Sequence, residues 1–126
     1  MRAREARVLS RAGHHEGAYY LTGLAVECGL KACIARRTKR YEFPDKKVVL
    51  DSYSHDLPTL LRTAGLQEAL DRDSTSRPGL VVNWAVVKDW SIQSRYTRKG
   101  KDESDSLYDA AVRSPDGVLK WIRQHW

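Results

Sequence analysis

Histidines and clustered cations are the side chains here that could do chemistry without a metal. Cleavage of RNA without a metal needs a base for the 2′-hydroxyl proton and a cation for the developing phosphate charge. A histidine is the natural base because it titrates near neutral pH. His14, His15 and His55 lie away from the chain end, and a polar, basic stretch supplies cations at Arg95, Arg98, Lys99 and Lys101. His14 and His15 are also typical of an exposed helix end.

His55 precedes Asp56 at the expected start of a helix. It either fixes the preceding loop or lines a groove as a site residue. Glu27 and Lys31 are four residues apart, with the acid on the N-terminal side, which is the better orientation for a helical ion pair. The pair lies at the border of an apolar arc. It is either a surface ion pair or a polar pair that orients Arg95 or a ligand.

A basic run marks the end of the expected long helix, at Arg36, Arg37, Lys39 and Arg40. Lys46 and Lys47 follow closely, with Tyr41 and Phe43 between the two groups. Cations favour a helix C-terminus through the helix dipole, so a solvated helix end is one interpretation. Cations interleaved with aromatic rings also suit single-stranded RNA, whose bases can stack.

The composition predicts one domain. The chain has 126 residues, of which 41% are apolar and 30% charged, with a formal net charge of +6. This length suffices for a core without a disulfide or metal. No apolar run approaches the roughly 20 residues of a membrane-spanning helix, and no secretory signal begins the chain. We therefore expect residues 1–126 to form a single domain of a cytoplasmic protein that does not contact a membrane.

Other residue patterns narrow the function. Cys28 and Cys33 are five apart, which is poor for pairing on a helix, so we expect two buried thiols in a reducing compartment. No Walker motif, GxGxxG, HExxH or carboxylate cluster is present, so we expect no cofactor and no metal. Residues 1–63 carry 12 Lys and Arg against 7 Asp and Glu, a net of +5, which favours contact with phosphates or acidic partners.

The first half of the chain predicts helices. Apolar residues at helical spacing indicate a helix over 2–13 and a longer one over 16–37 that is apolar nearly all round, as in the centre of a bundle. Residues 38–54 read as a connection in which Val48 to Leu50 could form a short strand. Ser54 is the expected cap of a further helix that Gly65 ends.

The second half predicts further helices. A turn or short helix is expected over 66–71, a break over 73–78, and helices over 80–91 and 102–113. Ser114, Pro115 and Asp116 have the order of a helix start, which either opens a new helix or kinks a continuing one. Four tryptophans fit helix faces, in the core or a dimer interface: Trp84, Trp90, Trp121 and Trp126. The predicted class is all-α, a bundle of four or five helices.

Four segments of the chain resemble the HEPN family of helical domains, in the family's order. They are GAYYLTGLAVECGLKACIAR from Gly17, SHDLPTLLRTAGL over 54–66, NWAVVKDWSIQSRY over 83–96 and AAVRSPDGVLKWIRQHW over 110–126. The resemblance implies an up-and-down, HEPN-like bundle that forms a homodimer. It also implies a prokaryotic setting in toxin–antitoxin pairs, phage defence or RNA metabolism.

Many members of that family are metal-independent ribonucleases, with an arginine followed four to six residues later by a histidine. Arg95, followed by Tyr96, matches the arginine. The residues where the histidine is expected are Gly100, Lys101 and Asp102, so the pair is half present. Relatives without the histidine are often linked to a minimal nucleotidyltransferase, which is the partner that the resemblance implies.

Three interpretations follow. The first is a binding or regulatory subunit of a toxin–antitoxin or defence system that lacks the ribonuclease motif and contacts RNA or a protein through Arg95, Tyr96 and the basic segment 36–47. The second is a metal-independent endoribonuclease toxin that uses Arg95 with His14, His15 or His55 as a non-standard base. The third is a purely structural helical homodimer.

Overall fold

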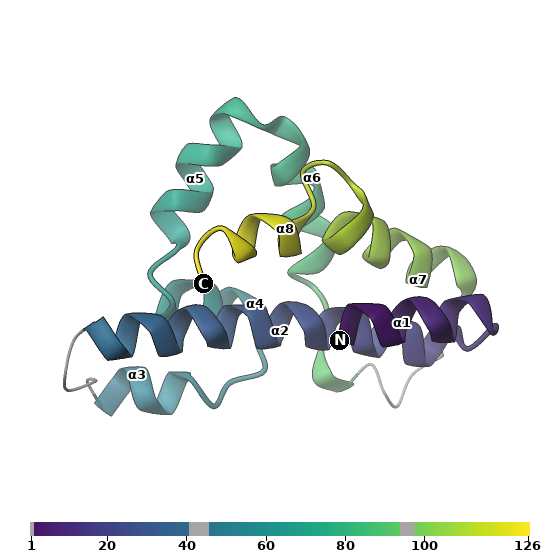
Figure 1. The fold of residues 1–126 in the computed structure, drawn as a ribbon, viewed down its shortest axis with the longest axis horizontal. Helices are drawn as coiled ribbons and strands as arrows, with labels where there is room; N and C mark the ends of the chain where they lie inside the picture. Colours follow the sequence, from purple (N-terminus) through teal and green to yellow (C-terminus); the bar gives the residue numbers. More distant parts are fainter. Residues whose placement is uncertain (1, 41–45, 94–97) are drawn as a thin grey trace.

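The computed structural model describes residues 2–40, 46–93 and 98–126, and this part of the chain is all-helical, without a strand. The central element is α2, His15–Arg40, whose 26 residues span about 39 Å. It crosses the width of the molecule in Figure 1. The prediction of a long helix over 16–37 is confirmed. Because α2 is apolar on most sides, other helices pack around it.

α1, Arg2–Arg11, lies antiparallel along the first half of α2 (Figure 1). Gly13 ends the helix with a φ of 85°, a conformation that favours glycine, and the amide of His14 donates to the carbonyl of Leu9 at 2.8 Å. Ala6 is the buried residue of α1. The four arginines of this helix therefore remain at the surface of the molecule.

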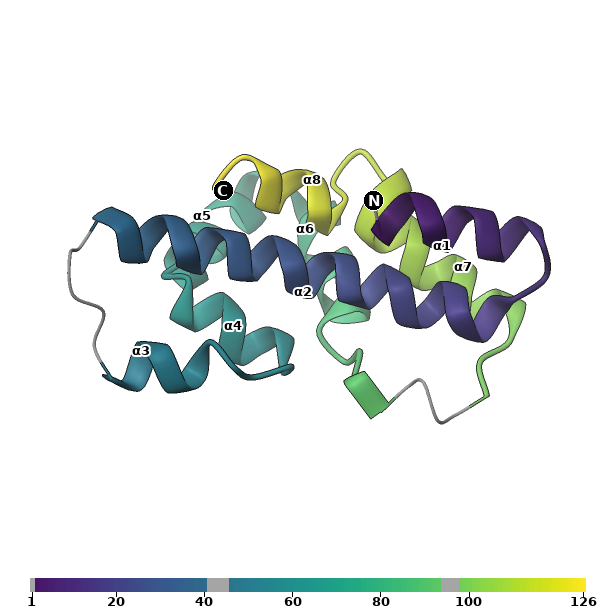
Figure 2. The same ribbon diagram turned by 60° about the horizontal axis from the view of Figure 1, so that its bottom comes forward.

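Figure 2 shows α3 and α4 on the side of α2 opposite to α1 and α8. α3, Lys46–Asp51, is a helix, so the possible strand at Val48 to Leu50 was wrong. It packs on α4, Leu57–Thr63. The described ranges contain no strand with which Val48 to Leu50 could pair. The cap of α4 is Asp56, not Ser54: its carboxylate accepts from the amide of Thr59 at 3.1 Å. Gly65 follows the helix with a φ of 72°, as predicted.

α5, Gln67–Ser76, extends through most of the expected break at 73–78. Asp73 lies within it and accepts a hydrogen bond from the indole of Trp121 at 2.8 Å. This contact comes from 48 residues away, so local sequence does not reveal it. α6, Pro78–Val87, follows after the real break at Arg77.

The last helices are α7, Lys101–Tyr108, a π-helical turn at Asp109–Arg113, and α8, Val118–Arg123. The helix expected over 102–113 is confirmed. Ser114 to Asp116 do not start a helix, because Gly117 is the cap of α8. The Asn83 amide holds the turn before α8 by donating to the Ser114 hydroxyl at 3.0 Å and to the Asp116 carbonyl at 2.8 Å. The described part thus contains more and shorter helices than the four or five expected.

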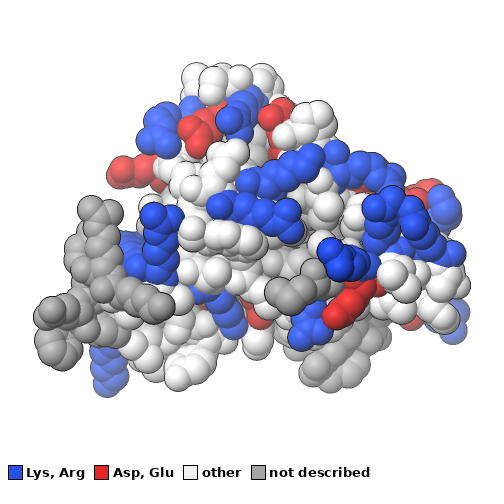
Figure 3. Space-filling model, in the orientation of Figure 1, with Lys and Arg blue, Asp and Glu red and all other residues white. Residues whose placement is uncertain are grey.

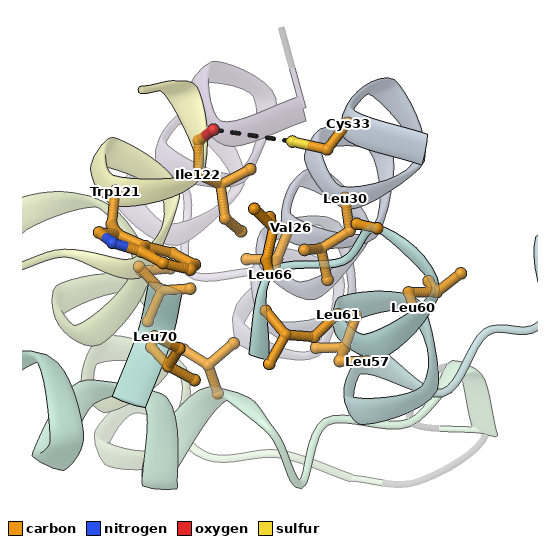
Figure 4. Packing of buried hydrophobic residues seen from close by; sticks show 14 of the residues in the cluster. Val26, Leu30, Cys33, Leu57, Leu60, Leu61, Leu66, Leu70, Trp121 and Ile122 are labelled. Atoms are coloured by element: carbon orange, nitrogen blue, oxygen red, sulfur yellow. Dashed lines mark hydrogen bonds between the residues drawn. The ribbon is translucent and has the colours of Figure 1, made fainter. Parts of the chain in front are cut away.

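The core lies where α2, α4 and α8 meet (Figure 4). Trp121 and Trp90 are buried there, as expected, but Trp126 is 45% exposed. Gly29 of α2 lets α8 approach, since a Cβ at that position would lie 3.1 Å from the Ile122 side chain. The Cys33 thiol donates to the Ile122 carbonyl at 3.8 Å, which ties the two helices (Figure 4).

Only one of the two cysteines matches its prediction. Cys33 is buried, whereas Cys28 is exposed on a face of α2 that the core does not cover. The five-residue spacing places them on different faces of the helix, and no disulfide joins them. None of the helices in the described ranges has the length and apolar character needed to cross a membrane.

Candidate functional site

A buried carboxylate on α2 joins three of the predicted site residues. The Glu27 side chain is only 5% exposed and lies 2.9 Å from His55 Nδ1 and 3.4 Å from Lys31 Nζ. We call Glu27, Lys31 and His55 the Glu27 cluster. Lys31 is one helical turn further along α2, whereas His55 comes from the segment before α4. The prediction of a Glu27–Lys31 pair is therefore confirmed, with His55 as an added partner.

Local hydrogen bonds fix His55 in this position. The Ser54 hydroxyl accepts from the amide of Asp56 at 3.0 Å, and Asp56 in turn caps α4. His55 lies between these two residues and turns toward α2. Val26 and Leu30, on either side of Glu27 in the sequence, are fully buried against α4. The packing of α4 on α2 thus places the His55 imidazole beside the Glu27 carboxylate.

The arrangement gives the imidazole a defined orientation. An ionised carboxylate only accepts hydrogen bonds, so the contact with such a carboxylate requires the His55 tautomer that carries its proton on Nδ1. Nε2 then has a free lone pair, and half of the side chain is exposed to solvent. A carboxylate-backed imidazole of this kind can take a proton as a general base. Lys31, one-third exposed, adds a positive charge at the same carboxylate.

Other predicted residues lie elsewhere or are not described. Arg95 and Tyr96 lie outside the described residues. Arg98 is exposed, and Lys99 pairs with Glu103 at 3.4 Å while lying 4.9 Å over the Tyr19 ring, so it secures the start of α7. His15 begins α2, about 18 Å along the helix from Glu27, so this chain does not bring the His14–His15 pair to the cluster.

The two described arginines of the basic run at the end of α2 contact two different segments of the chain. Arg36 donates to the carbonyl oxygen of Trp126 at 3.0 Å, and Arg37 donates to that of Thr63 at 3.1 Å. Lys39 and Arg40 lie in the last turn of α2, with side chains outside the described part. Both described arginines thus tie α2 to other segments while remaining exposed.

Sequence reasoning missed a basic face on the side of α1 and α8. Figure 3 shows Lys and Arg side chains gathered over these helices, with few acids between them. We define the basic face by residues exposed on α1, α8 and the end of α2: Arg2, Arg4, Arg7, Arg36, Lys120 and Arg123. The arginines of α1 alone could have signalled this face, but its other members depend on the packing of α8.

A groove of about 710 Å³ runs between α1, α2 and α8 in this face. Arg2 and Arg123 line it together with Trp126, small side chains of α2 and Glu5, whose carboxylate lies 3.4 Å from the Arg2 guanidinium. The Arg123 guanidinium lies 5.8 Å from the Trp126 ring. An exposed indole beside arginines can stack on a nucleobase.

Burial shifts the pKa values of Cys33 and His125, which lie outside the Glu27 cluster and the groove. Burial raises the pKa of the Cys33 thiol, although Arg36 opposes the shift. Burial also lowers the pKa of His125, and the Asp73 carboxylate partly offsets this. His125 lines a pocket of about 570 Å³ beside Arg36 and Arg37. Among the residues that the structure describes, no group of three His, Cys, Asp or Glu has the arrangement of a metal site.

Comparison with protein-family models, with curated proteins and with solved structures finds no match for this chain. The geometry of the Glu27 cluster, the basic face and the resemblance of the sequence are thus the grounds for a function.

Proposed function

We propose that this protein binds single-stranded RNA through its basic face, as a binding or regulatory subunit of a prokaryotic toxin–antitoxin or phage-defence system. The observation that carries the proposal is the groove between α1, α2 and α8, which Arg2, Arg123 and an exposed Trp126 line together. Arginines neutralise phosphates, and the indole offers a stacking surface that any base can use.

The biological setting rests on the resemblance to the HEPN family. That resemblance supports a HEPN-like, up-and-down arrangement of the helices, a homodimer, and a nucleotidyltransferase or another defence protein as partner, and we infer a cytoplasmic location from the unpaired cysteines. The departure from the family at positions 100–102 supports a role in binding rather than in cleavage through the family's motif.

The test is a fluorescence anisotropy titration of a labelled single-stranded RNA of about 20 nucleotides. The double variant Arg2→Gln/Arg123→Gln removes two charges from the groove. Arg77→Gln/Lys88→Gln removes two exposed charges that do not line it, and serves as the matched control. We expect about a tenfold loss of affinity in the groove variant and little change in the control. Equal affinities in both variants would refute the groove as the binding surface.

A second candidate function is metal-independent cleavage of RNA, which the Glu27–His55 contact of 2.9 Å favours. His55 would take the 2′-hydroxyl proton, and the resulting alkoxide would attack the adjacent phosphate, displacing the 5′-oxygen of the next nucleotide. Lys31, with Arg95 where the family has its arginine, would stabilise the charge on the phosphate.

Cleavage is measured with purified protein in EDTA. His55→Ala and Glu27→Gln should each abolish it, whereas His14→Ala, which changes an exposed histidine just before α2, should not. The Arg95→Ala variant tests the family's arginine in the same assay. Intact RNA with the unaltered protein would retire this second function and leave the binding proposal standing.

A further inference from the structure

A second basic pocket lies on the side of α2 that carries α3 and α4. It has a volume of about 430 Å³, and its cations come from three different helices: Arg37 of α2, Lys47 of α3 and Arg62 of α4. Asp51 is the acid among its lining residues. The cations therefore outnumber the acid among the lining residues, which favours an anionic ligand.

Arg37 is held in place between this pocket and the pocket that Gly65 and His125 line. One of its terminal nitrogens donates to the carbonyl of Thr63 at 3.1 Å. The guanidinium also lies against Gly65, where a Cβ would be 2.5 Å from the same nitrogen. The bare backbone of Gly65 thus makes room for the arginine, and a planar group with five N–H donors is fixed before any ligand arrives.

Arg62 and Lys47 are exposed and complete the pocket from the other helices. The Arg62 guanidinium donates a long hydrogen bond of 3.4 Å to the Thr59 hydroxyl. That hydroxyl in turn donates to the Asp56 carboxylate at 2.7 Å. A guanidinium held this loosely can turn toward an anion. Two arginines and a lysine around one space form the donor set that phosphate oxygens accept from.

We propose that this pocket, lined by Arg37, Lys47 and Arg62, binds a phosphate group. The group belongs either to a free nucleotide or to the backbone of an RNA strand, and in the second case the inference rests on the proposed function. The pocket is separate from the Glu27 cluster, since Arg37 lies about 15 Å further along α2 than Glu27. Arg37 recognises the phosphate by its forked donors, while Lys47 adds a point charge.

The test is calorimetric titration at constant ionic strength with three probes: inorganic phosphate, adenosine 5′-monophosphate and a short single-stranded RNA. Sodium acetate is the control anion. We expect inorganic phosphate to bind saturably and acetate not to. Arg37→Gln/Arg62→Gln should weaken phosphate binding about tenfold, and Arg77→Gln/Lys88→Gln should leave it unchanged. The probe whose affinity falls most in Arg37→Gln/Arg62→Gln identifies the source of the phosphate.

Arg37 also supports the fold through Thr63, so the exposed Arg62→Gln change alone provides a second test, with an expected loss of about threefold. Phosphate binding that is not saturable, or that is equal in Arg62→Gln and the unaltered protein, would overturn the proposal. The Arg2→Gln/Arg123→Gln and His55→Ala variants should keep phosphate binding. Failure of the pocket is therefore distinguishable from failure of RNA binding at the basic face.

Discussion

Glu27 shows how a buried charge is accommodated in this protein. Removing a carboxylate from water is costly, and here Lys31 and His55 offset that cost at 3.4 and 2.9 Å. The Lys31 ammonium and the His55 imidazole remain partly exposed, so they keep some hydration while the carboxylate has lost nearly all of its own. The effect of a substitution on the free energy of unfolding therefore depends on whether it leaves the buried carboxylate without a partner.

We predict that Lys31→Met/His55→Ala destabilises the protein more than Glu27→Gln does. The double variant leaves an unpaired buried carboxylate, which costs about 3–5 kcal/mol. Glu27→Gln leaves the Lys31 ammonium and the His55 imidazole, both of which water can reach, and should cost less than half as much. Urea unfolding at pH 7 gives both free energies of unfolding. The opposite ranking would show that the carboxylate does not depend on its two partners.

Asp73 is a second carboxylate with a specific partner. The hydrogen bond from the Trp121 indole, at 2.8 Å, is the main cause that holds the pKa of Asp73 below its ordinary value, and Arg72 adds to the shift. The folded pKa therefore lies below the unfolded one. The carboxylate stabilises the fold at pH values above the unfolded pKa and loses that effect as the pH falls through the folded one.

Asp73→Asn should therefore flatten the acid side of the stability profile. The unaltered protein should lose stability from about pH 4 downward, and the variant should lose less over the same range. Thermal melts in a series of acidic buffers provide the comparison. Parallel profiles for the two proteins would contradict a role for the Asp73–Trp121 contact in acid sensitivity.

At the scale of elements, the long helices could be predicted and the short ones could not. The apolar pattern around α2 and the caps near Gly13 and Gly65 are local signals, and both glycines adopt the positive φ that ends a helix. α3 has only six residues and no buried side chain, so its sequence carries no helical stripe. The start of α8 depends on Asn83, which binds the turn at Ser114 from α6.

The packing of α2 depends on Gly23. A Cβ at this position would overlap the Trp90 indole, which is buried beside it. Gly23→Ala should therefore destabilise the protein by about 1–3 kcal/mol, even though alanine is the better helix former. Gly100→Ser is the control, because nothing lies within 4 Å of a Cβ there and serine suits this N-cap position of α7. Thermal unfolding should show a lower midpoint for the first variant alone; unchanged midpoints in both would mean that Trp90 moves aside freely.

At the scale of the molecule, the sequence identified the members of the Glu27 cluster but did not predict that His55 lies beside the other two in the fold. Glu27 and Lys31 share a helix, so their spacing alone predicts the pair. His55 is 28 residues from Glu27, and only the docking of α4 on α2 joins them. The basic face was missed for the same reason, since Arg2 and Arg123 stand at opposite ends of the chain and line one groove.

The central claim is that the groove between α1, α2 and α8 contacts RNA phosphates. Measuring the RNA dissociation constant over a range of salt concentrations tests this most directly. Each phosphate contact in single-stranded RNA contributes about 0.7 to the slope of log affinity against log salt. Arg2→Gln/Arg123→Gln should therefore lower the magnitude of that slope by about 1.4 relative to Arg77→Gln/Lys88→Gln. Identical slopes for the two variants, or no RNA binding at low salt, would contradict the account.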